Sequence, residues 1–340
     1  VEDITPIADR SEKVAIIGAG PGGLAAADVL VRAGVKVTVY DRHDRAGGLM
    51  TYGIPGFKLE KDVVLRRVKL LEDAGVNFVL NCNVGEDITF QDIRAQNDAV
   101  LLATGVYKGR DLSGPGAGAQ GIVPALDYLT YSNKLSFGDS VPEYDSGELN
   151  AAGKNVVVIG GGDTAMDCVR TAFRQDAKSV KCLYRRDRAN MPGSQREVNN
   201  AEEEGVIFEW LAAPAGFVGN PVNAVKVQKM RLGAPDVSGR QSPEVIDGAD
   251  YNEAADLVIK ALGFEAEDLP VLWGCEELPI TRWGTVKAAY ETGATELEGV
   301  YAIGDIVRGA SLVVWAIRDG RDCADAILNK FAAVNTLAAE

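Results

Sequence analysis

Apolar residues along the chain gather into short runs that alternate with helix-prone stretches. Residues 14–17 are apolar, residues 24–33 are rich in alanine and leucine, and residues 35–40 read as a strand again. This order of strand, helix and strand predicts a βαβ unit, with glycines in its first turn.

The same order recurs later in the chain. Residues 155–159 are apolar and β-branched, residues 164–175 have a helical pattern, and residues 179–184 again resemble a strand. Two βαβ units predict an α/β fold with parallel sheets.

Other segments of the sequence predict more strands and a final helix. Residues 206–211 and 222–230 lack helical periodicity and favour antiparallel strands. A last helix is predicted from about residue 312 to residue 331. Further strands are predicted at residues 98–103, 256–261 and 299–303.

Charge and length narrow the class of protein. The 340 residues suffice for two domains, and 49 acidic against 35 basic residues give a net charge of -14. Such a field repels phosphate backbones and anionic membranes, so we expect no nucleic-acid and no membrane partner. No apolar run approaches the roughly 18 residues that cross a bilayer, which favours the cytoplasm.

Cysteine spacing argues against a disulfide scaffold, a redox disulfide or a metal site. The five cysteines are scattered, and none forms a CxxC pair. They are Cys82, Cys168, Cys182, Cys275 and Cys323. The sequence also begins at Val1 rather than methionine, and we expect that residues once preceded it.

The first glycine loop, Gly18, Gly20 and Gly23, forms GxGxxG between a predicted strand and a predicted helix, with Pro21 and Gly22 inside it. Such a loop gives a tight turn and lets a pyrophosphate approach the backbone. The helix start adds free N–H donors and a positive dipole end.

The strand after this loop ends in Tyr40, Asp41 and Arg42, which we expect to belong to the same site as the loop. An acid at this spacing accepts a hydrogen bond from a ribose 2′-hydroxyl and repels a 2′-phosphate, so FAD or NAD is the expected occupant. The alternative is a glycine-rich turn that binds no ligand.

The second glycine loop has the form GxGxxA, in which alanine replaces the third glycine. Arginines follow its next strand instead of an acid, and guanidinium groups suit a 2′-phosphate, so this loop is expected to bind NADPH. The alternative is that these arginines pair with Asp187 and Glu197. The predicted NADPH-binding residues are Gly160, Gly161, Gly162, Asp163, Thr164, Ala165, Arg185, Arg186 and Arg196.

Two dinucleotide sites of opposite charge preference predict hydride transfer between a nicotinamide and a flavin, with the cofactors carrying the chemistry. No catalytic side chain is therefore expected, and the single histidine, His43, is expected to be a surface loop residue.

Four stretches carry a resemblance over nearly the whole chain. They are VAIIGAGPGGLAAA at 14–27, GGLMTYGIPGFKLEK at 47–61, VVVIGGGDTAMDC at 156–168 and AIGDIVRGASLVVWAIRDGR at 302–321. In these stretches the chain resembles the two-dinucleotide-binding flavoproteins, in particular the small (beta) subunits of bacterial NADPH-dependent glutamate synthases.

The resemblance implies further residues at the FAD site. Gly47, Gly48 and Leu49 would line the flavin, as would Tyr52, Gly53, Ile54 and Pro55. Ala103, Thr104 and Gly105 would form a strand-end turn beside it, Gly304 and Asp305 would meet the ribityl or pyrophosphate, and Val313 and Val314 would start a helix that faces the ring. Read alone, Gly304 and Asp305 could cap a helix, and Thr104 and Gly105 could end a strand.

The resemblance also implies a domain plan of two Rossmann-like dinucleotide-binding domains, with the NADPH domain inserted into a discontinuous FAD domain. The predicted parts are residues 1–153 and 284–340 for FAD and residues 154–283 for NADPH. In the family a cysteine-rich segment before the first loop holds iron–sulfur clusters. This sequence lacks such a segment, so we expect no iron–sulfur cluster and either a fragment or a shortened relative.

Three functions fit these features. The first is an NADPH-dependent flavoprotein that passes electrons to a large glutamate synthase subunit or another acceptor, in glutamate biosynthesis. The second is a free-standing flavin reductase of a small molecule such as a quinone or an aldehyde. The third is a cofactor-holding subunit without turnover.

Overall fold

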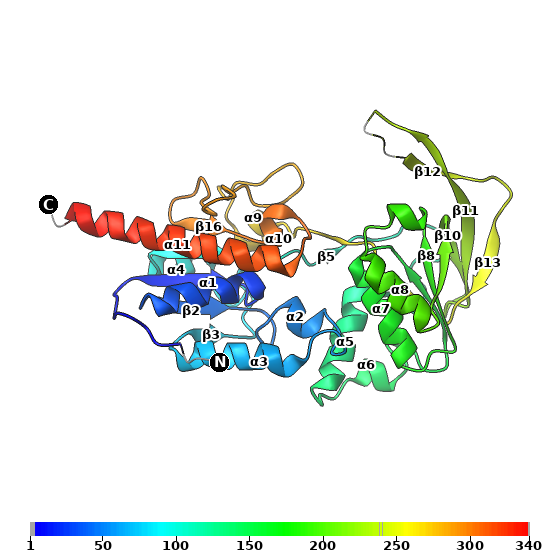
Figure 1. The fold of residues 1–340 in the computed structure, drawn as a ribbon, viewed down its shortest axis with the longest axis horizontal. Coiled ribbons are helices and arrows are strands. Elements are labelled where there is room, and N and C mark those ends of the chain that lie inside the picture. The colour runs from blue at the N-terminus through cyan, green and yellow to red at the C-terminus, as the bar shows by residue number, and fades with distance from the viewer. Residues whose placement is uncertain (1–3, 238, 240, 339–340) are drawn as a thin grey trace. The chain divides into compact units, whose positions relative to one another are not determined.

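The computed structural model describes residues 4–237, 239 and 241–338, and backbone contacts divide the chain into two compact units (Figure 1). The first unit consists of Val1–Thr51, Leu59–Lys108 and Phe264–Glu340. The second unit consists of Tyr52–Lys58 and Gly109–Gly263. The chain therefore passes between the units four times.

A five-stranded parallel sheet forms the centre of the first unit, in the order β16-β4-β1-β2-β3. Because β1 and β4 are buried on both faces, they read as continuous apolar runs in the sequence. The strands are β1 (Lys13–Ile17), β2 (Lys36–Tyr40), β3 (Asn77–Val79), β4 (Ala99–Leu102) and β16 (Val300–Ala302).

Helices cover this sheet, and α11 packs along α1 (Figure 1). Gly22 and Gly320 allow this contact, since a Cβ on Gly320 would lie 2.3 Å from the carbonyl oxygen of Gly22. The helices are α1 (Pro21–Arg32), α2 (Leu49–Tyr52), α3 (Lys61–Asp73), α4 (Phe90–Gln96), α9 (Leu269–Trp273), α10 (Asp305–Arg308) and α11 (Val313–Ala338). Within the described residues, no helix is both long enough and apolar enough to cross a membrane.

The second unit repeats this plan with a parallel sheet in the order β6-β14-β7-β8-β9. Its strands are β6 (Ile122–Pro124), β7 (Asn155–Ile159), β8 (Ser179–Tyr184), β9 (Ile207–Trp210) and β14 (Leu257–Lys260). Its helical elements are α5 (Ala125–Ser136), α6 (Pro142–Asp145), α7 (Asp163–Arg174), the short 3-10 helix η1 (Arg188–Asn190) and α8 (Gln195–Glu203).

An antiparallel sheet adjoins it, formed by β10 (Ala212–Val218), β11 (Ala224–Pro235), β12 (Gln241–Val245) and β13 (Tyr251–Ala254). The antiparallel prediction for residues 222–230 is confirmed by β11, whereas the one for residues 206–211 is wrong. β9 pairs with β8 in parallel, because α8 carries the chain back across the sheet before β9 begins. The short strands β5 (Lys108–Gly109) and β15 (Phe264–Glu265) form a separate two-stranded sheet.

The unit boundaries differ from the predicted ones at 154 and 283, because β6 pairs with β14 and so belongs to the second sheet. After residue 263, Leu269, Trp273 and Leu278 pack in the same core as Ala15 of β1. Residues 1–3 and 339–340 of the predicted outer parts lie outside the described residues.

Candidate dinucleotide-binding sites

The first glycine loop is pressed against the end of the neighbouring strand β4. Gly18 donates its N–H to the carbonyl oxygen of Tyr40 at 2.8 Å and has a φ of 111°. A Cβ at this position would lie 2.2 Å from the carbonyl oxygen of Ala103. Glycine is therefore needed at position 18 for the backbone of the turn, whether or not a ligand binds.

Gly20, in contrast, faces open space. A Cβ on Gly20 would meet nothing within 4 Å, and no side chain caps the helix α1 that begins beside it. Free N–H groups at a helix start, next to a glycine whose Cβ position is open, fit a pyrophosphate group. A Cβ on Gly23 would lie 2.1 Å from the carbonyl oxygen of Gly18, so the third glycine allows close packing of helix and strand.

Segments far apart in the sequence meet around this loop. Gly47 donates its N–H to the carbonyl oxygen of Ala19 at 2.8 Å, and a Cβ on Gly48 would lie 2.8 Å from the Cα of Gly20. The N–H of Ile303 binds the carbonyl oxygen of Leu102 at 3.0 Å. Three of the predicted FAD stretches, at 47–49, 103–105 and 304–305, thus lie near the first loop.

Asp41 holds the loop through its carboxylate. It accepts hydrogen bonds from the N–H of Ala19 at 2.7 Å and from the N–H and Nδ1 of His43, each at 2.8 Å. Burial acts to raise the pKa of Asp41, but the His43 hydrogen bonds outweigh it and lower the pKa below its usual value. Asp41 is therefore ionised at neutral pH, with acceptor capacity left for a hydroxyl.

Arg42, which follows Asp41, is bound by an acidic residue of the same unit. Its guanidinium binds Glu267 at 2.9 and 2.5 Å and stacks on the Tyr107 ring, 5.1 Å from the ring centre. The pair with Glu267 raises the pKa of Arg42. Arg42 is thus paired with Glu267. The sequence alone could not predict this pair, because the two residues are 225 positions apart.

A half-buried acid, Asp305, and the exposed apolar start of α11 also belong to the first unit. Burial raises the pKa of Asp305 to about 6, and the nearby Asp319 adds to this effect. At the start of α11, the exposed fractions are 37% for Val313, 59% for Val314 and 41% for Trp315. Consecutive exposed apolar side chains fit the face of an aromatic ring system.

The predicted flavin-lining residues 52–55 fall in the second unit. Tyr52, Gly53 and Pro55 are buried there. The Tyr52 ring contacts Phe137 edge-on at 6.3 Å between centres, and the Lys134 ammonium lies 5.7 Å from the ring centre. The backbone contacts of these residues therefore group them with the second unit, apart from the other FAD stretches.

The second glycine loop repeats the geometry of the first. Gly160 has a φ of 150°, and a Cβ there would lie 2.1 Å from the carbonyl oxygen of Ala261 at the end of β14. A Cβ on Gly162 would meet nothing within 4 Å, and no side chain caps α7. Ala165 is fully buried at the packing position.

Residues that the sequence reasoning missed enclose this loop. Asp163 accepts a hydrogen bond from the N–H of Ser194 at 3.0 Å, and the N–H of Gly193 binds the carbonyl oxygen of Gly161 at 2.9 Å. A Cβ on Gly161 would lie 2.4 Å from the Tyr184 ring. Tyr184 ends its strand just as Tyr40 does in the first unit, and this repeat was the available signal.

The arginines after β8 divide into two kinds. Arg188 is bound by Glu202 at 2.8 Å, and it also donates a hydrogen bond to Asn199. No acid in the described part of the chain pairs with Arg185, Arg186 or Arg196.

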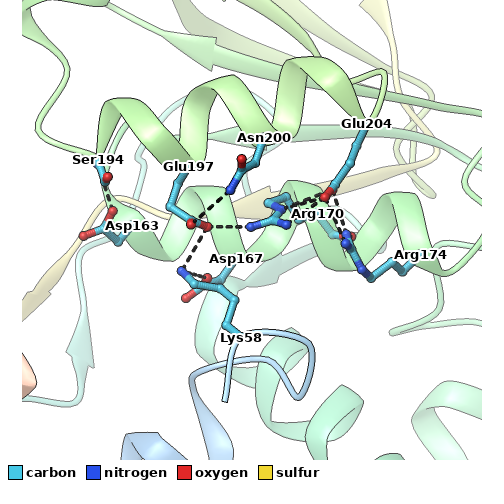
Figure 2. A network of polar contacts seen from close by, with 9 residues as sticks. All are labelled: Lys58, Asp163, Asp167, Arg170, Arg174, Ser194, Glu197, Asn200 and Glu204. Atoms are coloured by element: carbon cyan, nitrogen blue, oxygen red, sulfur yellow. Dashed lines mark hydrogen bonds and ion pairs between the residues drawn. The ribbon is translucent and has the colours of Figure 1, made fainter. Parts of the chain in front are cut away.

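The proposed acidic partners of these arginines are engaged elsewhere. Asp187 caps η1 by accepting a hydrogen bond from the N–H of Asn190, and Glu197 binds Arg170 at 2.7 Å and Lys58 at 3.2 Å (Figure 2). The Nε of Arg186 is buried without an acceptor among the described residues. The alternative in which Asp187 and Glu197 neutralise Arg185 and Arg186 is therefore wrong.

A sequence model of the pyridine nucleotide-disulphide oxidoreductase family matches residues 12–320. A Cereibacter sphaeroides protein provisionally named a glutamate synthase (NADPH) small chain is 71% identical over 98% of this chain and 81% of its own length. The glutamate synthase (NADPH) small chain of Azospirillum brasilense is 62% identical over 96% of this chain and 68% of its own. The chain belongs to the glutamate synthase small chains of this oxidoreductase family.

A solved structure supports the fold. Mycobacterium tuberculosis FprA in complex with NADPH superposes with a TM-score of 0.80 at 20% identity, over 97% of this chain and 86% of FprA. The predictions of a two-domain α/β fold, of this family and of an oxidoreductase are confirmed. All five cysteines are free and buried in this structure.

Proposed function

We propose that this chain binds FAD on the first unit and NADPH on the second, and that it takes electrons from NADPH for an acceptor. One observation carries the proposal. Two glycine loops share the same backbone geometry, yet an ionised Asp41 follows one, and arginines that pair with no acid among the described residues follow the other. An acid suits a ribose hydroxyl, and guanidinium groups suit a 2′-phosphate.

The residues have separate tasks under this proposal. Gly20 and Gly162 leave room for the two pyrophosphates, the starts of α1 and α7 offer N–H donors, and Val313 and Val314 cover one face of the flavin. Once bound, the nicotinamide and the flavin supply the hydride-transfer chemistry. The protein contributes binding and orientation, and no side chain need act as an acid or base.

The names of the two related proteins suggest which electron acceptor to propose. The two small chains are named for an NADPH glutamate synthase. We propose a large glutamate synthase subunit as the electron-accepting partner of this chain in glutamate biosynthesis, and the cytoplasm as the compartment.

A steady-state assay tests the acceptor. FAD-loaded protein should oxidise NADPH slowly with a quinone or an aldehyde and rapidly with an artificial electron acceptor or with the large glutamate synthase subunit. Fast turnover with the quinone or aldehyde alone would favour a free-standing reductase. Protein with bound FAD and no NADPH oxidation by any acceptor would leave only a cofactor-holding role and overturn the proposal.

A further inference from the structure

Helices α7 and α8 of the second unit face each other through charged side chains (Figure 2). Asp167, Arg170 and Arg174 follow each other on α7 at spacings that place them on one face. Arg170 binds Glu204 at 2.7 Å, and Arg174 binds the same carboxylate at 2.7 Å. The hydrogen bonds from Arg174 and Arg170 lower the pKa of Glu204 to about 2, so this carboxylate is ionised.

Asp167 is the member of this face that α8 does not neutralise. Its side chain is 10% exposed, and its cation partner within the described residues is Lys58, with 2.7 Å between Nζ and Oδ1. Lys58 also binds Glu197 on α8 at 3.2 Å. One lysine from a distant part of the sequence therefore joins both helices (Figure 2).

Phe57, the neighbour of Lys58, makes a second contact with the same helix. Its ring lies 3.9 Å from the guanidinium carbon of Arg174 and 4.8 Å from that of Arg170. Such cation–π contacts add to the ion pairs. We call Phe57 and Lys58 the clamp.

The clamp lies at one end of a short segment of the second unit. The chain joins this unit at Tyr52 and leaves it after Lys58. Tyr52, at the other end, contacts Phe137 and Lys134 near α5. The residues between them, 53–55, are thus held from both sides. The family resemblance implies that these residues line the flavin, and we adopt that role for them here.

The helices that receive the clamp carry the proposed NADPH site. α7 begins at the second glycine loop, and α8 bears Arg196. We propose that Lys58 is a positioning residue, which fixes the flavin-lining segment on the helices that bind NADPH. This inference rests on the proposed function and assigns Lys58 a role in the geometry of hydride transfer rather than in binding either cofactor.

The test compares three variants with the FAD-loaded wild-type chain. Lys58→Met removes the charge and keeps the length of the side chain, and Lys58→Arg restores the charge. Lys69→Met is the matched control, because Lys69 is an exposed lysine that pairs with Asp73 one helical turn away. The measurement is the rate of flavin reduction at saturating NADPH, together with the NADPH concentration that gives half of it.

Lys58→Met should lower the saturating rate about 10- to 100-fold, since small misplacements of reacting groups have effects of this size. The half-saturating NADPH concentration should change much less. Lys58→Arg should recover most of the rate, and Lys69→Met should match the wild type.

A double variant separates positioning from stability, because Lys58→Met leaves Asp167 buried without its cation. Lys58→Met/Asp167→Asn removes that charge and should recover the melting temperature but not the rate. A wild-type rate in Lys58→Met or in Lys58→Met/Asp167→Asn would overturn the proposal. A wild-type chain that NADPH does not reduce at all would instead overturn the proposed function.

Discussion

Single residues distinguish two loops whose backbones are alike. Asp41 is ionised and holds the first loop, while Arg185 and Arg186 follow the second without an acidic partner in the described residues. Both features could be predicted from residue type and spacing alone. The occupation of Arg42 by Glu267 could not, because that contact joins residues far apart in the sequence.

Removing Arg185 and Arg186 should change the choice of nicotinamide cofactor. In Arg185→Ala/Arg186→Ala, kcat/KM for NADPH should fall about 10- to 100-fold, as expected for lost charged hydrogen bonds of about 1.5–3 kcal/mol. The value for NADH, which lacks the 2′-phosphate, should change little.

Arg188→Ala is the control for this experiment, because Arg188 lies in the same segment but is bound by Glu202. It should leave the NADPH-to-NADH ratio of kcat/KM unchanged. An unchanged ratio in the double variant as well would remove the arginines from the NADPH site.

Asp305 should make the flavin-free protein less stable as pH rises. Its pKa of about 6 lies above the ordinary 3.8, so the unfolded chain loses its proton first and stability falls between about pH 4 and pH 6. Above pH 6 the full penalty of a buried charge remains.

Asp305→Asn should therefore melt at a higher temperature than the wild type at pH 7.5, and the gap should shrink at pH 4.5. The raised pKa of Asp167 contributes equally to both proteins and cancels in the comparison. A gap that does not depend on pH would show that Asp305 titrates normally.

The two units share the same order of strand, helix and strand around their glycine loops. The loops also agree, because the first glycine of each loop is tightly packed and the second is open. Gly18 and Gly160 are pressed against the ends of β4 and β14, while Gly20 and Gly162 face open space. The hydrophobic pattern predicted β7 and β8 at their observed bounds. It missed β6 as part of the second sheet, because a strand of three residues carries too little periodicity to assign it to a sheet.

Alanine at Gly20 should separate ligand binding from folding. The residue has a φ of -73°, which any amino acid adopts, and the protein leaves its Cβ position empty. Gly20→Ala should thus keep the melting temperature of the flavin-free protein and weaken FAD binding, measured by fluorescence titration.

Gly18→Ala should do the opposite and destabilise the flavin-free protein by about 1–3 kcal/mol, because its φ is positive and Ala103 is in the way. Wild-type FAD affinity in Gly20→Ala would contradict the proposed position of the pyrophosphate.

The whole molecule combines two dinucleotide-binding units in one chain, with the second unit set between parts of the first in the sequence. The two glycine loops could be predicted because each motif is local in the sequence, whereas the inserted arrangement of the domains was implied by the family resemblance. The contact of the clamp with α7 was not predictable, since Lys58 and its partner Asp167 are 109 positions apart and each looks like an ordinary surface charge in the sequence.

The central claim is that one unit holds FAD, the other holds NADPH, and electrons pass from NADPH to FAD. An anaerobic titration of the FAD-loaded protein tests it most directly, with visible flavin absorbance as the readout. NADPH should bleach the flavin completely at about one equivalent per FAD, and NADH should need a large excess. A flavin that stays oxidised under excess NADPH, or that responds equally to NADH, would contradict the account.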